Sequence, residues 1–332
     1  MKTTIIDIAK IAGVSVGTAS MAINNKPGIS EATRQKILEV ASRLNYTPNQ
    51  NARSLITKKS NTIGLVVTDV TNPFFGMLVN EINNAVISKG YNLLLGVSND
   101  TIENEKRSID TFLGQRVEGV IIVPCVQKEH DISHIYNLKT NNVPFVFATT
   151  AYPGVDADCI MTDLARGSYL LTKHLLDRGH TRIFLVSGYR ELILSSLRIR
   201  GYREAFKEKN LNYSEDWVIE TIPNFEHGYE VTERILAEKP DAIITINDVL
   251  ALGVIKCLKE NKIRVPEDIS VGGYDDLLYT SILETPLTTI RQPITEIANG
   301  SVEMLLRRLD GDKSPCETLY VEPILKVRAT TR

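Results

Sequence analysis

Residues Thr4 to Asn24, TIIDIAKIAGVSVGTASMAIN, decide how the N-terminal part of this chain folds. Apolar residues at helical spacing predict a first helix with one apolar face, made of Ile5, Ile8, Ala9 and Ala12. Thr4 is placed to cap this helix, and Asp7 lies three residues later, near the positive helix end. Gly13 permits a tight turn because glycine adopts positive φ without a clash. Ser15 then caps a second helix that ends near residue 23.

The two predicted helices are expected to pack closely on one another. Val14 would fill the gap between them, and Gly17, Ala19 and Ala22 are small enough to bring the second helix onto the first. This is the layout of a helix-turn-helix, whose second helix enters the major groove of DNA. Any small helical bundle could show the same pattern, so this stretch alone leaves both interpretations open.

The charge distribution favours the DNA-binding interpretation. Residues 1–60 contain nine Lys and Arg against three acidic residues, a net charge of +6, whereas the whole chain carries −2. The remaining 272 residues therefore carry −8. A basic head on an acidic body indicates a polyanionic partner for the head alone, and phosphate contacts supply most of the non-specific affinity for DNA.

Length and composition indicate an ordinary globular protein. A chain of 332 residues is expected to form two or three domains, and 43% hydrophobic with 23% charged residues is typical of such proteins. The N-terminus is polar within three residues and no apolar run reaches the length of a membrane span, so we expect a cytoplasmic protein. The isolated cysteines are expected to be buried thiols in a reducing compartment: Cys125, Cys159, Cys257 and Cys316.

A third helix is predicted from Ser30, closing a three-helix headpiece that ends before Pro48. Its expected apolar positions are Ile37, Leu38, Ala41 and Leu44. The segment that follows, NQNARSLITKKS (49–60), is short, polar and basic except for Leu55 and Ile56. Its composition favours a linker. The alternative is a hinge that becomes helical only on DNA, with Leu55 inserted into the minor groove.

From Thr62 onward, continuous apolar runs alternate with amphipathic helical stretches. TIGLVV, YNLLLGV, GVIIVP and PFVFA form one series, and RIFLVS, WVIET, DAIITI and ISVGGY form a second. Apolar runs separated by helices predict parallel sheets that are covered on both faces. Two such series imply two doubly wound lobes, and ligands of these sheets bind beyond the carboxyl ends of the strands.

Polar residues that follow these strands are the candidate ligand-binding residues: Asp69, Asn72, Thr149, Asn247, Asp248, Asp275 and Asp276, with Arg198 near the start of a helix. For each residue alone, a structural role is the stronger interpretation. Asn and Asp commonly cap the next helix, and Arg198 could be a surface ion-pair partner. Together, donors and acceptors around one cleft suit a small polyhydroxylated or heterocyclic ligand.

Three patterns suggest other chemistry but carry little weight. The G-x-S-x-G of residues 13–17 lacks the preceding strand that a hydrolase nucleophile requires. His130 and His134 have the spacing of two metal ligands, but without a third nearby ligand a solvated surface pair is favoured. Asp275 and Asp276 are adjacent in sequence and are not expected to converge on one bond. Because phosphate-binding and dinucleotide-binding motifs are also absent, the sequence predicts no cofactor, no metal and no catalytic residues.

Over essentially its full length the chain resembles the lactose-repressor (LacI/GalR) family of bacterial transcription regulators. The resemblance rests on these segments in order: IDIAKIAGVS, LNYTPNQNARSL, TNPFF, RGSYLLTKHLLDRGHTRI, RIRGYREAF, PEDISVGGYDD and PLTTIRQPITEIANGSVEMLL. It implies an α-helical helix-turn-helix headpiece (1–48), a hinge helix (49–60) and a two-lobed α/β core (61–332) resembling a periplasmic binding protein. The implied N-lobe spans about 61–161 plus 292–321, and the C-lobe about 162–291 plus 322–332.

The resemblance also implies roles for individual residues. Those implied to contact DNA are Thr4, Ser15, Val16, Gly17, Thr18, Ser20, Met21, Asn24, Asn49, Ala52 and Leu55, with Leu55 as the minor-groove wedge. Those implied to contact an effector are Asp69, Phe74, Phe75, Thr149, Arg198, Asn247 and Asp275. Two positions depart from the family: Met21 replaces a base-contacting Arg, and Thr149 replaces an Asp that many relatives use for ligand hydroxyls. Methionine cannot make a bidentate contact to guanine, so a different operator preference is expected.

The resemblance therefore implies a repressor that binds a pseudo-palindromic double-stranded DNA operator as a homodimer. A small effector, a sugar or related metabolite, would bind between the lobes and control operator affinity. Two alternatives come from other functional classes. A solute-binding protein would have the same core but no basic head, and an enzyme would use the cleft carboxylates for catalysis.

Overall fold

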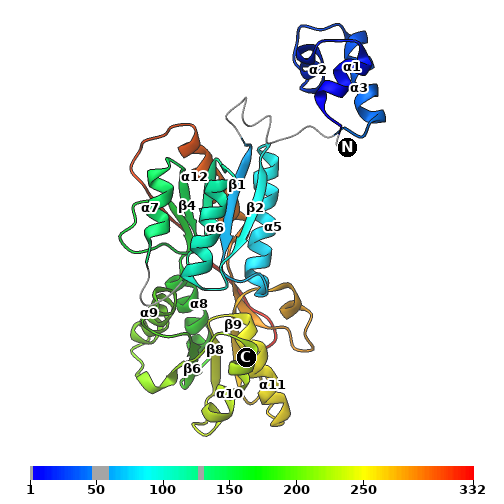
Figure 1. Cartoon of the computed structure of the whole chain (residues 1–332). Helices are drawn as coiled ribbons and strands as arrows, with labels where there is room; N and C mark the ends of the chain where they lie inside the picture. The colour runs from blue at the N-terminus through cyan, green and yellow to red at the C-terminus, as the bar shows by residue number, and fades with distance from the viewer. Residues whose placement is uncertain (1–2, 47–59, 126–130) are drawn as a thin grey trace. The chain divides into compact units, whose positions relative to one another are not determined.

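The structure is a computed structural model that describes residues 3–46, 60–125 and 131–332. The chain divides into two compact units, Met1–Ser60 and Asn61–Arg332. Figure 1 shows both, with the first unit in dark blue. The predicted hinge residues Asn49, Ala52 and Leu55 lie outside the described residues, as does His130.

The described residues of the first unit, mainly 3–46, form three helices, α1 (Ile5–Ala12), α2 (Val16–Ile23) and α3 (Glu31–Arg43). Thr4 and Asp7 form a capping box at α1, as the sequence predicts. Gly13 ends α1 with a φ of 69°, and the Ser15 hydroxyl accepts a hydrogen bond from the backbone N–H of Thr18 at the start of α2. These local signals were correctly predicted because each depends on neighbours within four residues.

Two packing predictions for the first unit are wrong. Gly17 is exposed, and a Cβ placed on it would meet only Ser15 Oγ at 3.6 Å, so it does not bring α2 onto α1. Ala19 and Ala22 make that contact instead, in an apolar cluster with Ile8 and Ala12. In α3, Leu38 is exposed, and the cluster is completed by the buried residues Ile37, Val40 and Ala41.

The second unit consists of two α/β lobes, each built on a six-stranded sheet. In chain order its helices are α5 (Pro73–Ser88), α6 (Ile102–Gly114), α7 (Ser133–Thr140), α8 (Leu164–Asp177), α9 (Ile193–Glu208), α10 (Phe225–Leu236), α11 (Asp248–Glu260) and α12 (Ile294–Leu309). Two short 3₁₀ helices are η1 (Glu215–Trp217) and η2 (Leu278–Ser281). These helices alternate with the strands along the chain, as the sequence predicts.

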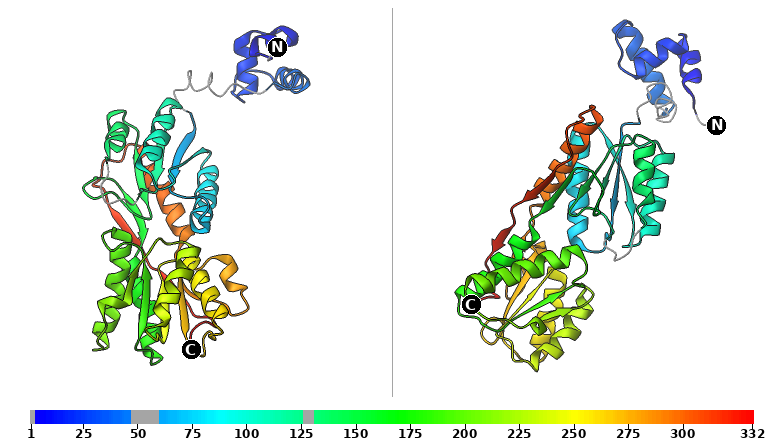
Figure 2. Two further views of the ribbon diagram at one scale, coloured as in Figure 1. Left: turned by 60° about the horizontal axis from the view of Figure 1, so that its bottom comes forward. Right: turned by 90° about the vertical axis from the view of Figure 1, so that its left-hand side faces the viewer.

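The N-lobe sheet has the strand order β11-β5-β4-β3-β1-β2, and all its pairings are parallel. Its strands are β1 (Thr62–Val67), β2 (Asn92–Val97), β3 (Gly119–Ile122), β4 (Phe145–Ala148), β5 (Cys159–Thr162) and β11 (Thr318–Val321). Helices α5 and α12 pack together on one face, and α6 and α7 cover the other (Figure 2). Burial on both faces explains the continuous apolar runs of β1 and β3.

The C-lobe sheet has the order β12-β10-β9-β8-β6-β7. Its strands are β6 (Ile183–Ser187), β7 (Val218–Glu220), β8 (Ala242–Thr245), β9 (Ser270–Asp275), β10 (Thr288–Arg291) and β12 (Ile324–Lys326). Helix pairs α8–α9 and α10–α11 flank it. The predicted doubly wound folds are confirmed, with one departure: the edge strand β12 runs antiparallel to β10.

The chain crosses between the lobes three times. It passes from β5 into α8, from β10 into α12, and from β11 into β12. Strands β5, β10 and β11 each leave their sheet at the carboxyl end and enter the other lobe. The carboxyl ends of the two parallel sheets therefore face each other, which is where α/β folds bind ligands.

Three of the cysteines, Cys125, Cys159 and Cys257, are buried free thiols as predicted, whereas Cys316 is exposed. Cys316 lies in the loop between α12 and β11. The apolar periodicity of the sequence did not predict this loop. Among the described residues, no single helix has the length and apolarity to cross a bilayer. In the part of the chain that the structure describes, the bent pair α1 and α2, with an angle of 106° between them, is the only pair that reaches those limits together.

Candidate functional site

The outward face of α2 carries most of the residues predicted to contact DNA. Ala19 and Ala22 are buried, so helical spacing turns the opposite face to solvent. That face consists of Val16, Gly17, Ser20, Met21 and Asn24, which are exposed or half-buried. Val16 is 44% exposed, and no residue of α2 is charged.

The other described residues of the predicted DNA-contacting set lie at helix starts. Thr4 caps α1 and Ser15 caps α2, while the hydroxyls of Ser15 and Thr18 lie 2.9 Å apart in a hydrogen bond. Such N-termini present unpaired backbone N–H groups and a positive dipole end, which favour a phosphate. Lys10, on the exposed side of α1, adds positive charge to the same unit.

In the C-lobe, Arg198 lies in the second turn of α9 and is 8% exposed, so it is not the surface ion-pair partner that the sequence allowed. Its guanidinium lies over the ring of Tyr274, 4.5 Å from the centroid, and Nη1 donates to the carbonyl oxygen of Leu194 at 3.2 Å. Its Nε is buried and has no hydrogen-bond partner among the described residues. A buried guanidinium with a free N–H favours an acceptor brought by a ligand.

Asp275 ends β9 beside Tyr274 and is 4% exposed. Gln292 Nε2 donates to Asp275 Oδ1 at 2.7 Å, and Thr162 Oγ1 donates to Gln292 Oε1 at 2.8 Å. Burial raises the pKa of Asp275 to about 7, while Arg198 and the Gln292 hydrogen bond act in the opposite direction. The hydrogen bonds from Thr162 to Gln292 and from Gln292 to Asp275 join β5 of the N-lobe to β9 of the C-lobe. Gln292 lies at the crossing from β10 to α12.

Asn247 and Asp248 start α11 beside these residues. Asn247 caps the helix, with Oδ1 accepting from the N–H of Leu250 at 2.8 Å, and its Nδ2 donates to the carbonyl oxygen of Pro223 at 3.1 Å. Asp248 is fully buried and accepts from Thr289 Oγ1 at 2.6 Å and from the N–H of Leu277 at 2.8 Å. Burial, together with the charge of Asp275, raises the pKa of Asp248 to about 8.

The side chain of Asp276 has different partners from that of its neighbour Asp275. Its carboxylate pairs with Arg291 at 2.6 Å and with Arg328, so it stabilises the junction of β10 with the C-terminal segment. Asp275 and Asp276 both have positive φ, 114° and 57°. The strand ends in a turn here and sends the two carboxylates to different partners, which agrees with the prediction that they do not converge.

The N-lobe candidates follow β1. Asn72 caps α5 by accepting from the N–H of Phe74, while Asp69 accepts from the backbone N–H and hydroxyl of Thr71. Phe74 is buried and Phe75 half-buried, and their rings meet edge to face at 5.2 Å. Both belong to an apolar cluster that also contains Leu277, two residues after Asp275. This cluster brings the phenylalanines and the C-lobe loop together.

Thr149 follows β4 and has a φ of 68°, which is rare for a β-branched residue. Its N–H donates to the carbonyl oxygen of Ile160 at 2.8 Å, which holds this conformation in place. Strained backbone of this kind is concentrated at functional sites. Among the described residues, no hydrogen bond or ion pair joins Thr149 or Asp69 to Arg198, Asn247 or Asp275.

His134 is fully buried, so the prediction of a solvated histidine pair is wrong for this residue. Its Nε2 lies 2.7 Å from Glu105 Oε1, and Glu105, also fully buried, accepts from Tyr152 OH at 2.8 Å and from the N–H of Cys125 at 2.9 Å. These partners are far apart in sequence, and spacing on one helix gives no indication of them. In the described part of the chain, no cluster of His, Cys, Asp and Glu is suited to a metal ion.

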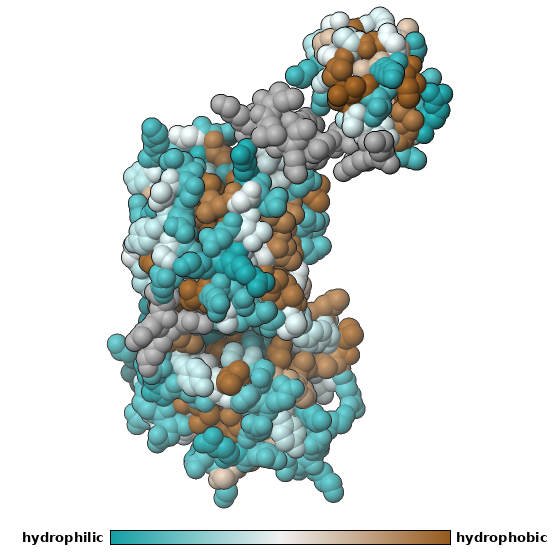
Figure 3. Space-filling view, in the orientation of Figure 1, coloured by the Kyte–Doolittle hydropathy of each residue, from teal (hydrophilic) through white to brown (hydrophobic). Residues whose placement is uncertain are grey.

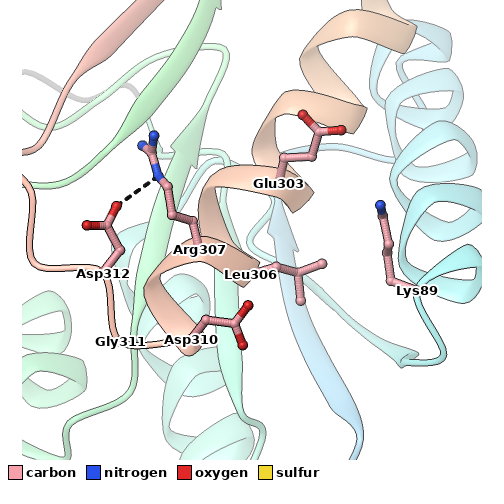
Figure 4. A pocket seen from close by; sticks show the side chains of 7 residues that line it. All are labelled: Lys89, Glu303, Leu306, Arg307, Asp310, Gly311 and Asp312. Atoms are coloured by element: carbon pink, nitrogen blue, oxygen red, sulfur yellow. Dashed lines mark ion pairs between the residues drawn. The ribbon is translucent and has the colours of Figure 1, made fainter.

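A separate open cavity of about 610 Å³ lies beside the end of α12 (Figure 4). It is lined by Lys89, Glu303, Leu306, Arg307, Asp310, Gly311 and Asp312. Its charged groups are of both signs, and Arg307 pairs with Asp312 at 3.2 Å. None of the predicted effector residues lines it.

Sequence reasoning did not single out Gln292, Tyr274 or Thr162. Each acts on a predicted residue through a long-range contact: Tyr274 with Arg198, and Gln292 between Thr162 and Asp275. The only sequence signal for these residues was their position. Tyr274 ends the predicted strand ISVGGY, Thr162 ends β5, and Gln292 follows β10.

Comparison with known proteins agrees with this arrangement. Residues 4–49 match the family described as bacterial regulatory proteins, lacI family, and residues 172–331 match a periplasmic binding protein-like domain. The chain is 33% identical to the HTH-type transcriptional repressor PurR of Vibrio parahaemolyticus, over 99% of this chain and 98% of PurR. It is also 33% identical to the ribose operon repressor of Escherichia coli, over 98% and 99% of the two chains.

Among solved structures, the Lac repressor dimer bound to operator and the anti-inducer ONPF matches with a TM-score of 0.88 and 28% identity, covering 100% of this chain and 99% of that one. A helix-turn-helix unit followed by a two-lobed α/β unit defines a DNA-binding transcriptional regulator with an effector-binding core. The chain belongs to the lacI family of bacterial regulatory proteins.

Proposed function

We propose that this protein is a cytoplasmic repressor that binds a pseudo-palindromic operator as a homodimer and responds to a small effector held between its lobes. The observation that carries this proposal is a buried guanidinium and a buried carboxyl group at the carboxyl edge of the C-lobe sheet, with the Nε of Arg198 lacking a partner among the described residues. Arg198 and Asp275 are both more than nine-tenths buried, and no described ion pair joins them. Buried polar groups with unused hydrogen-bonding capacity are costly, so a ligand that bonds to both would be strongly favoured.

The effector is proposed to be a sugar or a related metabolite. Arg198 offers donors and Asp275 offers acceptors, a combination that suits adjacent hydroxyl groups. Asn247 lies beside them, and Phe74 and Phe75 supply apolar surface for a ring face from the N-lobe. Asp69 and Thr149 complete the proposed set. The ribose operon repressor and Lac repressor among the related proteins make a sugar a reasonable first class to test.

The proposed coupling runs through the lobe crossings. An effector that bonds to Asp275 competes with Gln292 for the same carboxylate, and Gln292 also holds Thr162 at the first crossing. A change in the hydrogen bonds that join Thr162, Gln292 and Asp275 would alter the angle between the lobes. The spacing of the two hinges in a dimer would then change as well. Half-sites lie about one helical turn or a multiple apart, so a small shift weakens both headpiece contacts together. The coupling works in either direction, as induction or as corepression.

The DNA interface is proposed to consist of the outward face of α2, the two capped helix starts and a hinge. Asn49, Ala52 and Leu55 form the hinge part, with Leu55 as a wedge in the minor groove. We further propose that the protein has no enzymatic activity. The related proteins are named as transcriptional repressors, and the buried carboxylates Asp248 and Asp275 are already held by Thr289 and Gln292.

Two assays on the full-length protein test the proposal. Duplex binding is measured by fluorescence anisotropy over a salt series, and a steep loss of affinity with salt together with a site preference is expected. A thermal-shift screen of sugars, nucleosides and amino acids then identifies the effector, because a ligand of the native state raises the melting temperature. Binding that is insensitive to salt and equal for all duplexes would contradict the proposal.

Arg198→Ala is expected to abolish both the thermal shift and the effect of the effector on DNA affinity, while operator affinity without effector is unchanged. Arg200→Ala is the matched control. Arg200 lies two residues further along α9, is exposed, and pairs only loosely with Glu204 at 3.7 Å. A normal effector response in Arg198→Ala would remove this residue from the site.

A further inference from the structure

The outward face of α2, made of Val16, Gly17, Ser20, Met21 and Asn24, has an unusual composition for a surface that contacts DNA. Its five residues include no charged side chain, and Met21 and Val16 are its two largest groups. Arg34, whose guanidinium reaches α2, is engaged with backbone: it donates to the carbonyl oxygens of Lys26 at 2.7 Å and Ala22 at 3.3 Å. It holds the end of α2 and its following turn.

The polar side chains on or beside this face are also partly engaged within the helix. Asn24 Nδ2 donates to the carbonyl oxygen of Ser20 at 2.9 Å and lies 3.3 Å from Ser20 Oγ. Ser15 and Thr18 bond to each other through their hydroxyls. A bidentate contact to adenine needs a free amide, and a bidentate contact to guanine needs a guanidinium or ammonium group. On the outward face of α2 the one amide, that of Asn24, is engaged by Ser20, and no guanidinium or ammonium group is present.

The remaining chemistry is apolar. In the major groove, the C5-methyl group of thymine is the apolar feature of the base edges, and a methylated cytosine carries the same group. Methionine is flexible and adapts to irregular surfaces. A Cβ added to Gly28 would lie 3.8 Å from Met21 Sδ, so the loop after α2 lies near one side of this side chain and leaves it half-buried.

We propose that α2 recognises its operator half-site mainly through C5-methyl groups of pyrimidines, contacted by Met21 and Val16. This inference rests on the proposed function, since it requires that α2 enters a major groove. It specifies which base feature supplies the sequence preference. Phosphate contacts from the basic headpiece would supply affinity without distinguishing one sequence from another.

The experiment starts by enriching a pool of duplexes with a randomised central region on the full-length protein. In the enriched duplex, each thymine of a half-site is then replaced singly by deoxyuridine, which removes only the C5-methyl group. We expect affinity to fall about fourfold for one half-site and about fifteenfold when both are changed, the size expected for one buried methyl-sized group each. Replacing a cytosine at the sensitive position by 5-methylcytosine should recover part of the affinity of thymine.

Two variants assign the effect to side chains. Met21→Ala should make the thymine and deoxyuridine duplexes bind equally at one position, and Val16→Ala should do so at another. Met77→Ala is the matched methionine control, because Met77 is exposed on α5 in the second unit. It should leave the thymine preference unchanged. Circular dichroism of the variants checks that the headpiece helices remain folded.

The outcomes separate this inference from the proposed function. If no duplex is enriched over the starting pool, the proposed function itself fails. If an enriched duplex binds tightly but deoxyuridine changes its affinity at no position, DNA binding stands and methyl recognition is wrong. A thymine preference that is unchanged in both Met21→Ala and Val16→Ala would also overturn the assignment to α2.

Discussion

Two buried carboxylates, Asp248 and Asp275, lie next to each other at the carboxyl edge of the C-lobe sheet. Asp248 is completely buried, and its two hydrogen bonds join α11 to β10 and to the loop at Leu277. Burial raises the pKa of both side chains from 3.8, to about 8 for Asp248 and about 7 for Asp275. A protonated carboxyl at this position bonds to its neighbours without the cost of a buried charge.

These pKa values predict that the core becomes less stable as pH rises. Between pH 4 and about 8 the native state holds protons that the unfolded chain has lost, so the free energy of unfolding falls with pH. We expect the melting temperature to fall from pH 6.5 to 8. His174, whose buried ring has its pKa lowered from 6.5 to about 4, adds an opposite change near pH 6.5, and this change is common to the parent and the Asp248 variant, so it cancels in the comparison. Asp248→Asn should show a smaller fall than the parent.

Asp110→Asn, at an exposed position of α6, controls for the change in charge and should melt like the parent at each pH. Parallel pH dependences for the parent and Asp248→Asn would show that Asp248 is ionised throughout the range and that its pKa is not raised.

At the scale of elements, the C-lobe depends on glycines that let two helix pairs approach closely. A Cβ on Gly201 of α9 would lie 1.9 Å from the carbonyl oxygen of Ala165 in α8. In the other pair, a Cβ on Gly253 of α11 would lie 2.1 Å from the carbonyl oxygen of Phe225. Backbone atoms cannot yield locally, so any side chain at these positions must push the helices apart.

Gly201→Ala is therefore expected to destabilise the second unit by about 1–3 kcal/mol or more, the usual cost of overpacking. Urea unfolding measures this as a lower midpoint. Gly114→Ala is the matched control, because Gly114 is also helical and its Cβ would meet nothing within 4 Å. It should leave the midpoint unchanged or raise it slightly, since alanine favours helix. Equal midpoints for both variants would show that α8 and α9 are not in such close contact.

For the whole molecule, one exposed apolar surface lies on the C-lobe near η2. Leu278 and Ile282 are each 79% exposed, the highest values among the large hydrophobic residues of the described chain. Figure 3 shows apolar residues gathered on the side of the C-lobe where this segment lies. Contiguous exposed apolar surface marks an interaction site, and a homodimer requires one.

We predict that Ile282→Glu weakens the proposed homodimer, because a charge would be buried against an apolar partner surface. Its dissociation constant should rise by about tenfold or more, as expected from losing the burial of one large apolar side chain. Sedimentation velocity over a dilution series measures the change. Leu211→Glu, in the loop after α9 and 38% exposed, is the control and should leave the dimer intact. A variant that dimerises like the parent would place the interface elsewhere.

Much of the headpiece and the order of the elements could be predicted because the signals are local. The caps at Thr4 and Ser15, the turn at Gly13 and the apolar runs of β1 and β8 depend on residues nearby in sequence. The fold class followed from the alternation of runs and helices. For the candidate site, the strand ends drew attention to Asp275 and Asn247, because polar residues that follow parallel strands lie at the carboxyl edge of the sheet.

The sequence by itself determined where helices and strands form and that a basic, helical head precedes two parallel-sheet lobes. Only the tertiary structure decided which side chains are buried and what they contact. It buried His134 against Glu105, left Gly17 and Cys316 in solvent, and joined Thr162 to Asp275 through Gln292. These outcomes depend on partners that are distant along the chain, and periodicity records only which face of an element is apolar, not what packs against it.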